Sequence, residues 1–167
     1  RKSGLTLREE IVLHLHGLRH IEVDIEGPYA STREGISKAL GIKPSQLSRE
    51  LQPLLMGREV EWVAVHVLGF RKRVRAYRLT DTGITKAERI IESLKDVAVT
   101  FIDEFGNSET STLEKAVKRM ERRYGYLELL RMRGGSGDGQ IVAVSSTQLS
   151  KPERFVGRSG ELDSILK

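Results

Sequence analysis

The densest group of side chains able to do chemistry is a run of cations, RKRVRAYR, between Arg71 and Arg78. Five of these eight residues are Lys or Arg, and none is acidic. Guanidinium and ammonium groups at this density favour the binding of phosphate groups. The alternative is a solvated strand edge, because Lys and Arg often protect exposed edges from pairing with other chains.

These cations lie in a segment with the pattern of a β-hairpin. Val60 to Leu68 (VEWVAVHVL) is rich in β-branched and aromatic residues, Gly69 and Phe70 interrupt it, and Arg71 to Leu79 (RKRVRAYRL) follows as a second extended run. Side chains alternate between the two faces of a strand, but a projecting hairpin exposes both faces near its tip. We therefore expect several of the cations to reach the same polyanion.

A second polar group lies on a predicted helix-turn-helix between Ser31 and Gly57. Thr32 can cap a first helix, Gly41 can end it, and Pro44 suits the first turn of a second helix. The apolar residues that helical spacing turns inward on the second helix are Leu47, Leu51 and Leu54. The polar residues left on its outer face, near its N-terminus, are Ser45, Gln46, Ser48 and Arg49, preceded by Lys43.

Three further segments are expected to support these two groups. An amphipathic helix is predicted from about Thr6 to Leu18, and alternating residues predict a short strand at 21–25. Thr80 can cap a helix whose apolar stripe is Ile84, Ala87, Ile91 and Leu94.

Pro53 is expected to kink the second helix of the helix-turn-helix or to end it early, because it removes the amide bond to the Arg49 carbonyl.

The order of these elements resembles archaeal winged-helix transcriptional regulators of the broad MarR-like kind. The resemblance covers about residues 5–94 and is carried by STREGISKALGIKPSQLSREL, the basic turn and RVRAYRLTDTG. It implies an α+β fold, a winged helix-turn-helix with a small C-terminal α/β extension, in which the second helix enters the major groove and the hairpin holds the DNA backbone. The residues expected to contact double-stranded DNA are Thr32, Lys43, Ser45, Gln46, Ser48, Arg49, Arg71, Lys72, Arg73, Arg75 and Arg78.

Charge and composition favour an anionic partner without identifying it. The 167 residues carry a formal charge of +5, and residues 1–94 hold 16 Lys and Arg against 12 Asp and Glu. No apolar run approaches the roughly 20 residues of a membrane span, and the N-terminus has no signal region. We therefore expect a cytoplasmic protein with no membrane partner. The absence of cysteine excludes disulfides and thiolate metal sites.

Neither a catalytic set nor a metal site is visible. His14, His16 and His20 are close in sequence, but the first two point to different faces of the predicted helix, and Glu10 alone does not complete a ligand set. The glycine-rich GGSGDG at 134–139 lacks the Lys-Ser or Lys-Thr end of a P-loop, so it predicts a flexible turn or linker. We expect no enzyme activity, no cofactor and no metal in this fragment.

Residues 1–95 are thus expected to form the winged helix-turn-helix domain, and 96–133 a small strand-helix unit that serves as a spacer or as the contact of a possible homodimer. Residues 97–102 predict a strand. The following DEFGNSE predicts a solvated turn, in preference to a metal or acid-base pair at Asp103 and Glu104. Ser111 with Glu114 predicts a capping box at the start of the next helix. The inward positions of the following helix are Leu113, Ala116, Val117, Met120 and Tyr124. Residues 126–132 are expected to pack as helix or strand, and 141–144 to form one more strand.

The final stretch, ERFVGRSGELDSILK, resembles the entry segment of AAA and STAND-type ATPases. The resemblance implies that Phe155, Val156, Gly157 and Arg158 help to line an adenine pocket, and that residues 134–167 are a linker and the start of a truncated ATPase domain. The helix-turn-helix together with the basic hairpin leads us to expect a sequence-specific module that binds double-stranded DNA and regulates transcription. The ATPase-like segment gives the alternative, a protein-interaction or autoinhibitory module of a larger ATPase.

Overall fold

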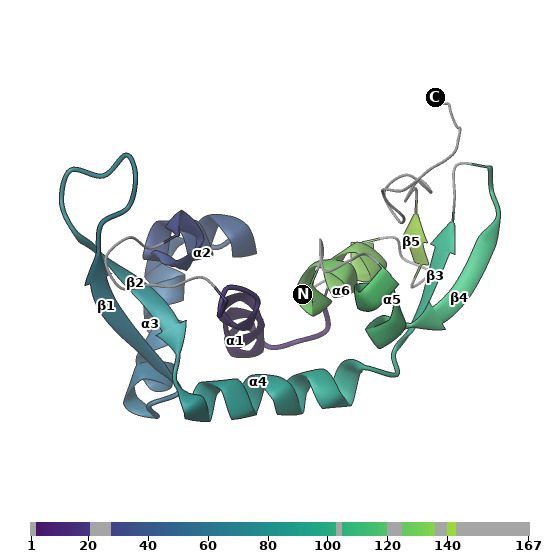
Figure 1. The fold of residues 1–167 in the computed structure, drawn as a ribbon, viewed down its shortest axis with the longest axis horizontal. Helices are drawn as coiled ribbons and strands as arrows, with labels where there is room; N and C mark the ends of the chain where they lie inside the picture. The colour runs from purple at the N-terminus through teal and green to yellow at the C-terminus, as the bar shows by residue number, and fades with distance from the viewer. Residues whose placement is uncertain (1–2, 21–27, 103–104, 120–124, 136–139, 143–167) are drawn as a thin grey trace. The chain divides into compact units, whose positions relative to one another are not determined.

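The computed structural model describes residues 3–20, 28–102, 105–119, 125–135 and 140–142 (Figure 1). The chain forms two units, Leu5–Glu92 (the first unit) and Ser93–Lys167 with Arg1–Gly4 (the second unit). Both combine helices with strands, so the expected mixed α+β class is confirmed. The predicted features outside the described residues are the strand at 21–25, the pair Asp103 and Glu104, the helix positions Met120 and Tyr124, and the ATPase-like segment 153–167.

The core of the first unit is made by three helices, α1 (Leu7–Gly17), α2 (Arg33–Leu40) and α3 (Pro44–Met56). Their apolar stripes bury one another, as the helical spacing predicted. The fully buried large side chains are Ile11, Leu15, Ile36, Leu40, Leu47, Leu51 and Leu54. An ion pair between Arg8 Nε and Glu50 Oε2, 2.8 Å apart, also joins α1 to α3.

The predicted signals at the ends of α2 and α3 are confirmed. The Thr32 hydroxyl accepts a hydrogen bond from the Gly35 amide at 3.0 Å, which caps α2. Gly41 ends the helix in the left-handed conformation at φ 67°. Pro44 is the first residue of α3, where the hydrogen-bond donor that proline lacks is not needed. A turn of three residues therefore fixes the angle between the two helices.

Of the two effects expected of Pro53, a kink or an early end of α3, the early end is wrong, because the helix continues to Met56. Pro53 cannot donate to the Arg49 carbonyl, and both residues are exposed. Leu54, one residue later, is buried and holds the last turn against the core. The helix then closes through hydrogen bonds from the Gly57 amide to the Pro53 carbonyl, 2.9 Å, and from the Glu59 amide to the Leu54 carbonyl, 3.0 Å.

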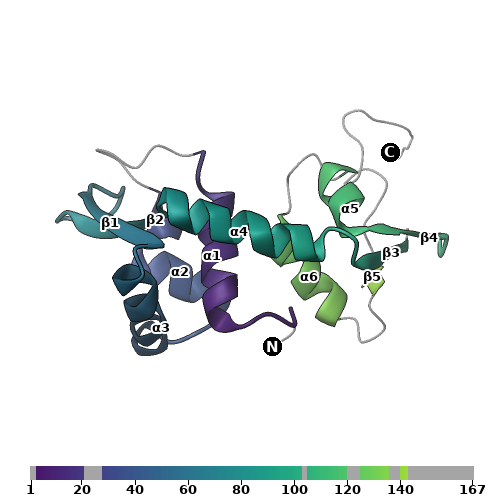
Figure 2. The same cartoon turned by 90° about the horizontal axis from the view of Figure 1, so that it is seen from below.

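The predicted hairpin is present, with shorter strands than expected. Strand β1 (Val60–Val65) pairs antiparallel with β2 (Val74–Leu79), in a register that places Val60 opposite Leu79 and Val65 opposite Val74. The first three residues of the basic run thus lie in the connecting loop, 66–73, which extends beyond the strands in Figure 1. A bridge between Thr32 and Ala76 ties the other edge of β2 to the start of α2. Helix α3 lies beside this hairpin (Figure 2).

Helix α4 (Asp81–Leu94) follows β2 directly. Thr80 caps it as predicted, by accepting a hydrogen bond from the Gly83 amide at 3.1 Å. A short segment, Tyr29–Ser31, forms the 3-10 helix η1 before α2. Of the predicted stripe on α4 only Ala87 is fully buried, while Ile84, Ile91 and Leu94 are half-buried. The stripe is therefore less buried than its spacing suggested.

The second unit contains the strands β3 (Ala98–Ile102), β4 (Ser108–Thr112) and β5 (Gln140–Val142) and the helices α5 (Leu113–Arg119) and α6 (Tyr126–Gly135). β3 lies between the other two, antiparallel to β4 and parallel to β5. The predicted capping box at Ser111 is wrong. Ser111 is still paired with Val99 in the sheet, and the cap is Thr112, whose hydroxyl accepts from the Lys115 amide at 3.3 Å.

Within the described residues, no helix is both long enough and apolar enough to cross a membrane.

Replacing Gly35 by Ala should destabilise the first unit strongly. A Cβ at this position would lie 1.9 Å from the backbone oxygen of Tyr29, so α2 and η1 could not keep their close approach. We expect the free energy of unfolding to fall by about 3 kcal/mol in urea denaturation. Gly17→Ala is the matched control, because nothing lies within 4 Å of its Cβ. Equal stability of the two variants would contradict the packing described here.

Candidate nucleic-acid interface

The outer face of α3 carries three polar residues in its first two turns, Ser45, Gln46 and Arg49, and Lys43 precedes the helix. Lys43, Ser45 and Arg49 are exposed and Gln46 is half-buried. The helix presents them to solvent because Leu47, Leu51 and Leu54 occupy the opposite face and are at most 2% exposed. Lys43 precedes the helix without a side-chain capping bond. The amides of the first turn and the positive end of the helix dipole therefore add to the charge of Lys43 and Arg49.

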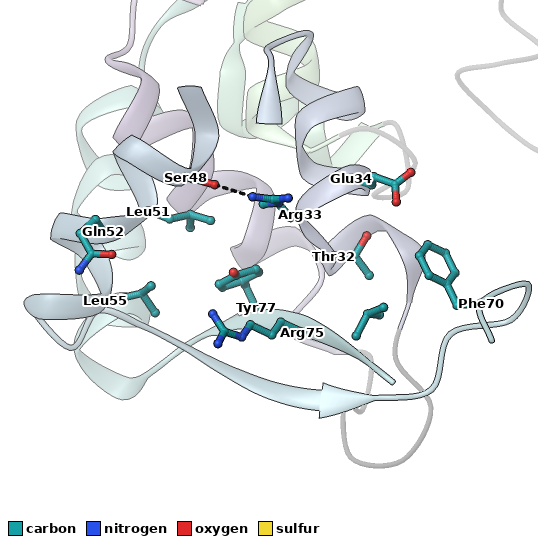
Figure 3. A pocket seen from close by; sticks show the side chains of 11 residues that line it. Thr32, Arg33, Glu34, Ser48, Leu51, Gln52, Leu55, Phe70, Arg75 and Tyr77 are labelled. Carbon is teal, nitrogen blue, oxygen red and sulfur yellow. Dashed lines mark hydrogen bonds between the residues drawn. The ribbon is translucent and has the colours of Figure 1, made fainter. Parts of the chain in front are cut away.

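Ser48 differs from these neighbours because it is half-buried and holds a side chain of another helix. Its hydroxyl accepts a hydrogen bond from Arg33 Nη1 at 3.0 Å, which joins the start of α2 to the middle of α3 (Figure 3). Helical spacing predicts Ser48 on the outer face and does not single out Arg33 as a candidate residue. Spacing along one helix cannot reveal this contact, because it depends on the angle between two helices.

A groove of about 430 Å³ lies between α3, the start of α2 and β2 (Figure 3). On the α3 side it is lined by Ser48, Leu51, Gln52 and Leu55, and on the hairpin side by Phe70, Val74, Arg75 and Tyr77. Thr32, Arg33 and Glu34 complete it at the start of α2. The groove thus combines an apolar lining with two guanidinium groups, those of Arg33 and Arg75, and one carboxylate, that of Glu34. This arrangement suits an anionic group that approaches between α3 and the hairpin.

The five cations of the basic run have different surroundings. Arg78 Nε lies 2.7 Å from Glu61 Oε2, its cross-strand neighbour, so this carboxylate balances its charge. Arg73 Nη2 donates to the Ala64 carbonyl at 2.8 Å, which orders the side chain but leaves its charge uncompensated. Arg71 and Lys72 are exposed in the loop between the strands. These differences rank Arg71, Lys72 and Arg73 above Arg78 as contacts for an anion.

Arg75 is held over the ring of Trp62. Its Cζ lies 4.1 Å from the ring centroid, within the range of a cation–π interaction. Trp62 is opposite Tyr77 in the register, and both belong to the strand face that carries Arg75. The Trp62 ring therefore holds the guanidinium group of Arg75, a residue that also lines the groove.

The structure gives Thr32 a role different from the expected DNA contact. It is 3% exposed, and its hydroxyl both donates to the Tyr29 carbonyl at 2.7 Å and accepts from the Gly35 amide. Its hydrogen-bonding capacity is used in fixing the start of α2. Thr32 therefore fixes the start of α2 and so positions Arg33, the next residue.

The histidines of α1 serve packing and hydrogen bonding. His14 Nε2 lies 2.8 Å from the Ala30 carbonyl, so that nitrogen carries the proton. Burial lowers the pKa of His16, and the neighbouring Arg19 lowers it further, while Glu88 on α4 opposes the shift. Across the described part of the chain, no group of three or more His, Cys, Asp or Glu could hold a metal ion.

Comparison with protein-family models, curated proteins and solved structures finds no match to this chain.

The stability of the first unit should decrease as the pH falls below about 6.5. The unfolded chain binds a proton at His16 near that ordinary pKa, whereas the folded chain binds it only at a lower pH. The free energy of unfolding therefore falls as the pH falls between these two pKa values. It stops falling once the pH is below the pKa of His16 in the folded chain. Urea denaturation of the protein and of His16→Gln between about pH 7.5 and 5 checks this. The same pH dependence in both proteins would show that His16 is not its source.

Proposed function

We propose that the first unit is a winged-helix module that binds double-stranded DNA, with transcriptional regulation as its biological role. The observation that carries the proposal is the groove, since it joins the polar face of α3 to the basic hairpin through Arg33 and Arg75. The order of three helices, hairpin and fourth helix supports the winged-helix assignment. The MarR-like resemblance of residues 5–94 rests on the same order of elements and agrees with this assignment.

In this proposal α3 enters the major groove of B-form DNA. Ser45, Gln46 and Arg49 then face the base edges, where Gln and Arg side chains can discriminate adenine and guanine. The same helix does not fit the deep, narrow major groove of double-stranded RNA. This difference favours DNA as the partner.

One phosphate backbone would cross the groove beside α3. Arg33 and Arg75 approach it from opposite sides of the groove, from α2 and from β2, and Ser48 keeps Arg33 in place. Lys43 and the first amides of α3 lie near the backbone at the end of the helix. The hairpin loop then continues along the duplex toward the adjacent minor groove, with Arg71, Lys72 and Arg73 as further phosphate contacts. Affinity would come mainly from these contacts and would fall with salt.

Exchanging Arg33 and Arg75 together for Ala should weaken DNA binding and lower its salt dependence. Each lost phosphate contact should reduce the slope of log affinity against log salt by about 0.9. Fluorescence anisotropy of a labelled duplex, titrated at several salt concentrations, gives both quantities. The double variant should bind all sequences more weakly, because phosphate contacts carry no sequence information.

The control for this experiment removes two positive charges that do not line the groove, Arg89 on α4 and Lys115 on α5, both exposed. Arg89→Ala with Lys115→Ala should leave the slope unchanged. Thermal unfolding without DNA separates lost contacts from lost stability, because Arg33 also holds α2 to α3. Equal slopes for the two double variants would contradict the proposed path of the backbone.

A further inference from the structure

The tip of the hairpin carries an apolar side chain that the fold does not use. Leu68 is 99% exposed, although its neighbour Val67 is 3% exposed. The other large exposed apolar residues of the described chain keep more of their surface covered, Phe105 at 79% and Met56 at 76% exposed among them. Leu68 therefore contributes almost nothing to the core, and its whole side chain is accessible to a partner.

The loop holds Leu68 in a defined place. The Phe70 amide donates to the Val67 carbonyl at 3.0 Å, which closes a four-residue turn with Leu68 at its second position. Gly69, at the third position, has φ 92°, as a type II turn requires. Leu68 thus projects from a closed turn, in which the left-handed residue is a glycine.

Both ends of this turn are anchored in the first unit. Val67 belongs to a buried cluster with Val65 and Ala76, against which Phe70 also packs. The Phe70 ring lies 6.1 Å from that of Tyr29, between centroids. A side chain held in this way loses little additional freedom when it is buried by a partner.

The surroundings of Leu68 are cationic. Arg71, Lys72 and Arg73 follow within five residues, and no acidic residue occurs between Glu61 and Asp81. A leucine among cations matches a partner with an anionic surface and an apolar interior. The duplex is such a partner, because its phosphates flank stacked bases, and proteins that insert a leucine between base pairs from the minor groove use this combination.

We infer that Leu68 inserts between two base pairs of the bound duplex from the minor groove and kinks the DNA. The inference rests on the proposed function, which brings the same loop to the minor groove. A bilayer also has an anionic surface and an apolar interior, but one leucine offers little of the broad apolar face that membrane-surface elements use. Insertion is easiest at pyrimidine–purine steps, so the bound sites should contain such a step at the position of the tip.

The experiment uses the full chain and a duplex selected from a random-sequence pool by binding to it. Donor and acceptor dyes at the duplex ends report bending by energy transfer, and 2-aminopurine at the selected step reports unstacking. The protein should bend the duplex by roughly 20–90° and raise the 2-aminopurine emission. Leu68→Ala should lose most of both signals and about tenfold in affinity, with an unchanged salt slope, because no charge is removed.

Two further variants make the result specific. Leu68→Met keeps an apolar side chain of similar size and should retain the bend, whereas Phe105→Ala removes another exposed apolar group and should change neither signal. Because Leu68 is almost fully exposed, Leu68→Ala should unfold at the same temperature as the parent protein. A loss of bending therefore cannot be attributed to a loss of folding.

A straight duplex in the parent complex, or a bend that Leu68→Ala preserves, would overturn the inference while leaving DNA binding intact. If selection enriches no duplex, the proposed function fails and the inference fails with it. Sedimentation with vesicles of phosphatidylcholine and phosphatidylserine tests the membrane as the alternative partner of Leu68. Co-sedimentation that Leu68→Ala abolishes would assign the tip to a membrane surface and overturn insertion into DNA.

Discussion

The burial of one face of α3 is the constraint on which the rest of the first unit depends. Leu47, Leu51 and Leu54 pack into the core made with α1 and α2, and this leaves a single orientation for the helix. A rotation of α3 by a third of a turn would expose leucines and bury Arg49, at a cost of several kcal/mol. Hydrophobic packing therefore decides which polar residues can meet a ligand, although none of the leucines meets it.

The same packing builds the groove. With α3 fixed, its lateral residues Ser48 and Gln52 face the hairpin, and the bridge from Thr32 to Ala76 sets the distance of β2 from α2. Arg33 and Arg75 are then held by partners within the unit, a serine hydroxyl and a tryptophan ring. Neither partner is anionic, so both guanidinium charges remain available to an incoming phosphate. Arg78 is opposed by Glu61 instead, and such an exposed pair contributes only about 0–1 kcal/mol to stability.

Much of the first unit could be predicted from the sequence because its signals are local. The capping residue Thr32, the turn at Gly41, the proline at the start of α3 and the β-branched and aromatic residues of Val60–Val65 each report on neighbouring residues. The length of α3 could not be predicted in this way, because Leu54 packs into the core and outweighs the missing bond at Pro53. In the second unit, Thr112 rather than Ser111 caps α5 because sheet pairing holds Ser111 in β4.

The candidate site was less predictable than the fold. Helical spacing identified Ser45, Gln46 and Arg49 but could not reveal that Arg33 crosses from α2 to Ser48. Density of charge identified the basic run but could not separate Arg78, which faces a carboxylate, from Arg71 and Lys72, which do not lie in a strand. The sequence pattern predicts that Leu68 ends a strand, and only the closed turn at 67–70 shows that it lies at the tip of the hairpin.

The most direct test of the central claim, that α3, the groove and the hairpin bind DNA as one surface, is the emission of Trp62 during a DNA titration. Trp62 is the only tryptophan of the chain, and it supports Arg75 at the groove. Its emission should change in parallel with the anisotropy of a labelled duplex, return when salt is added, and change much less in Arg75→Ala. A rise in anisotropy with constant Trp62 emission would place the DNA elsewhere on the chain, and no rise at low salt would contradict DNA binding itself.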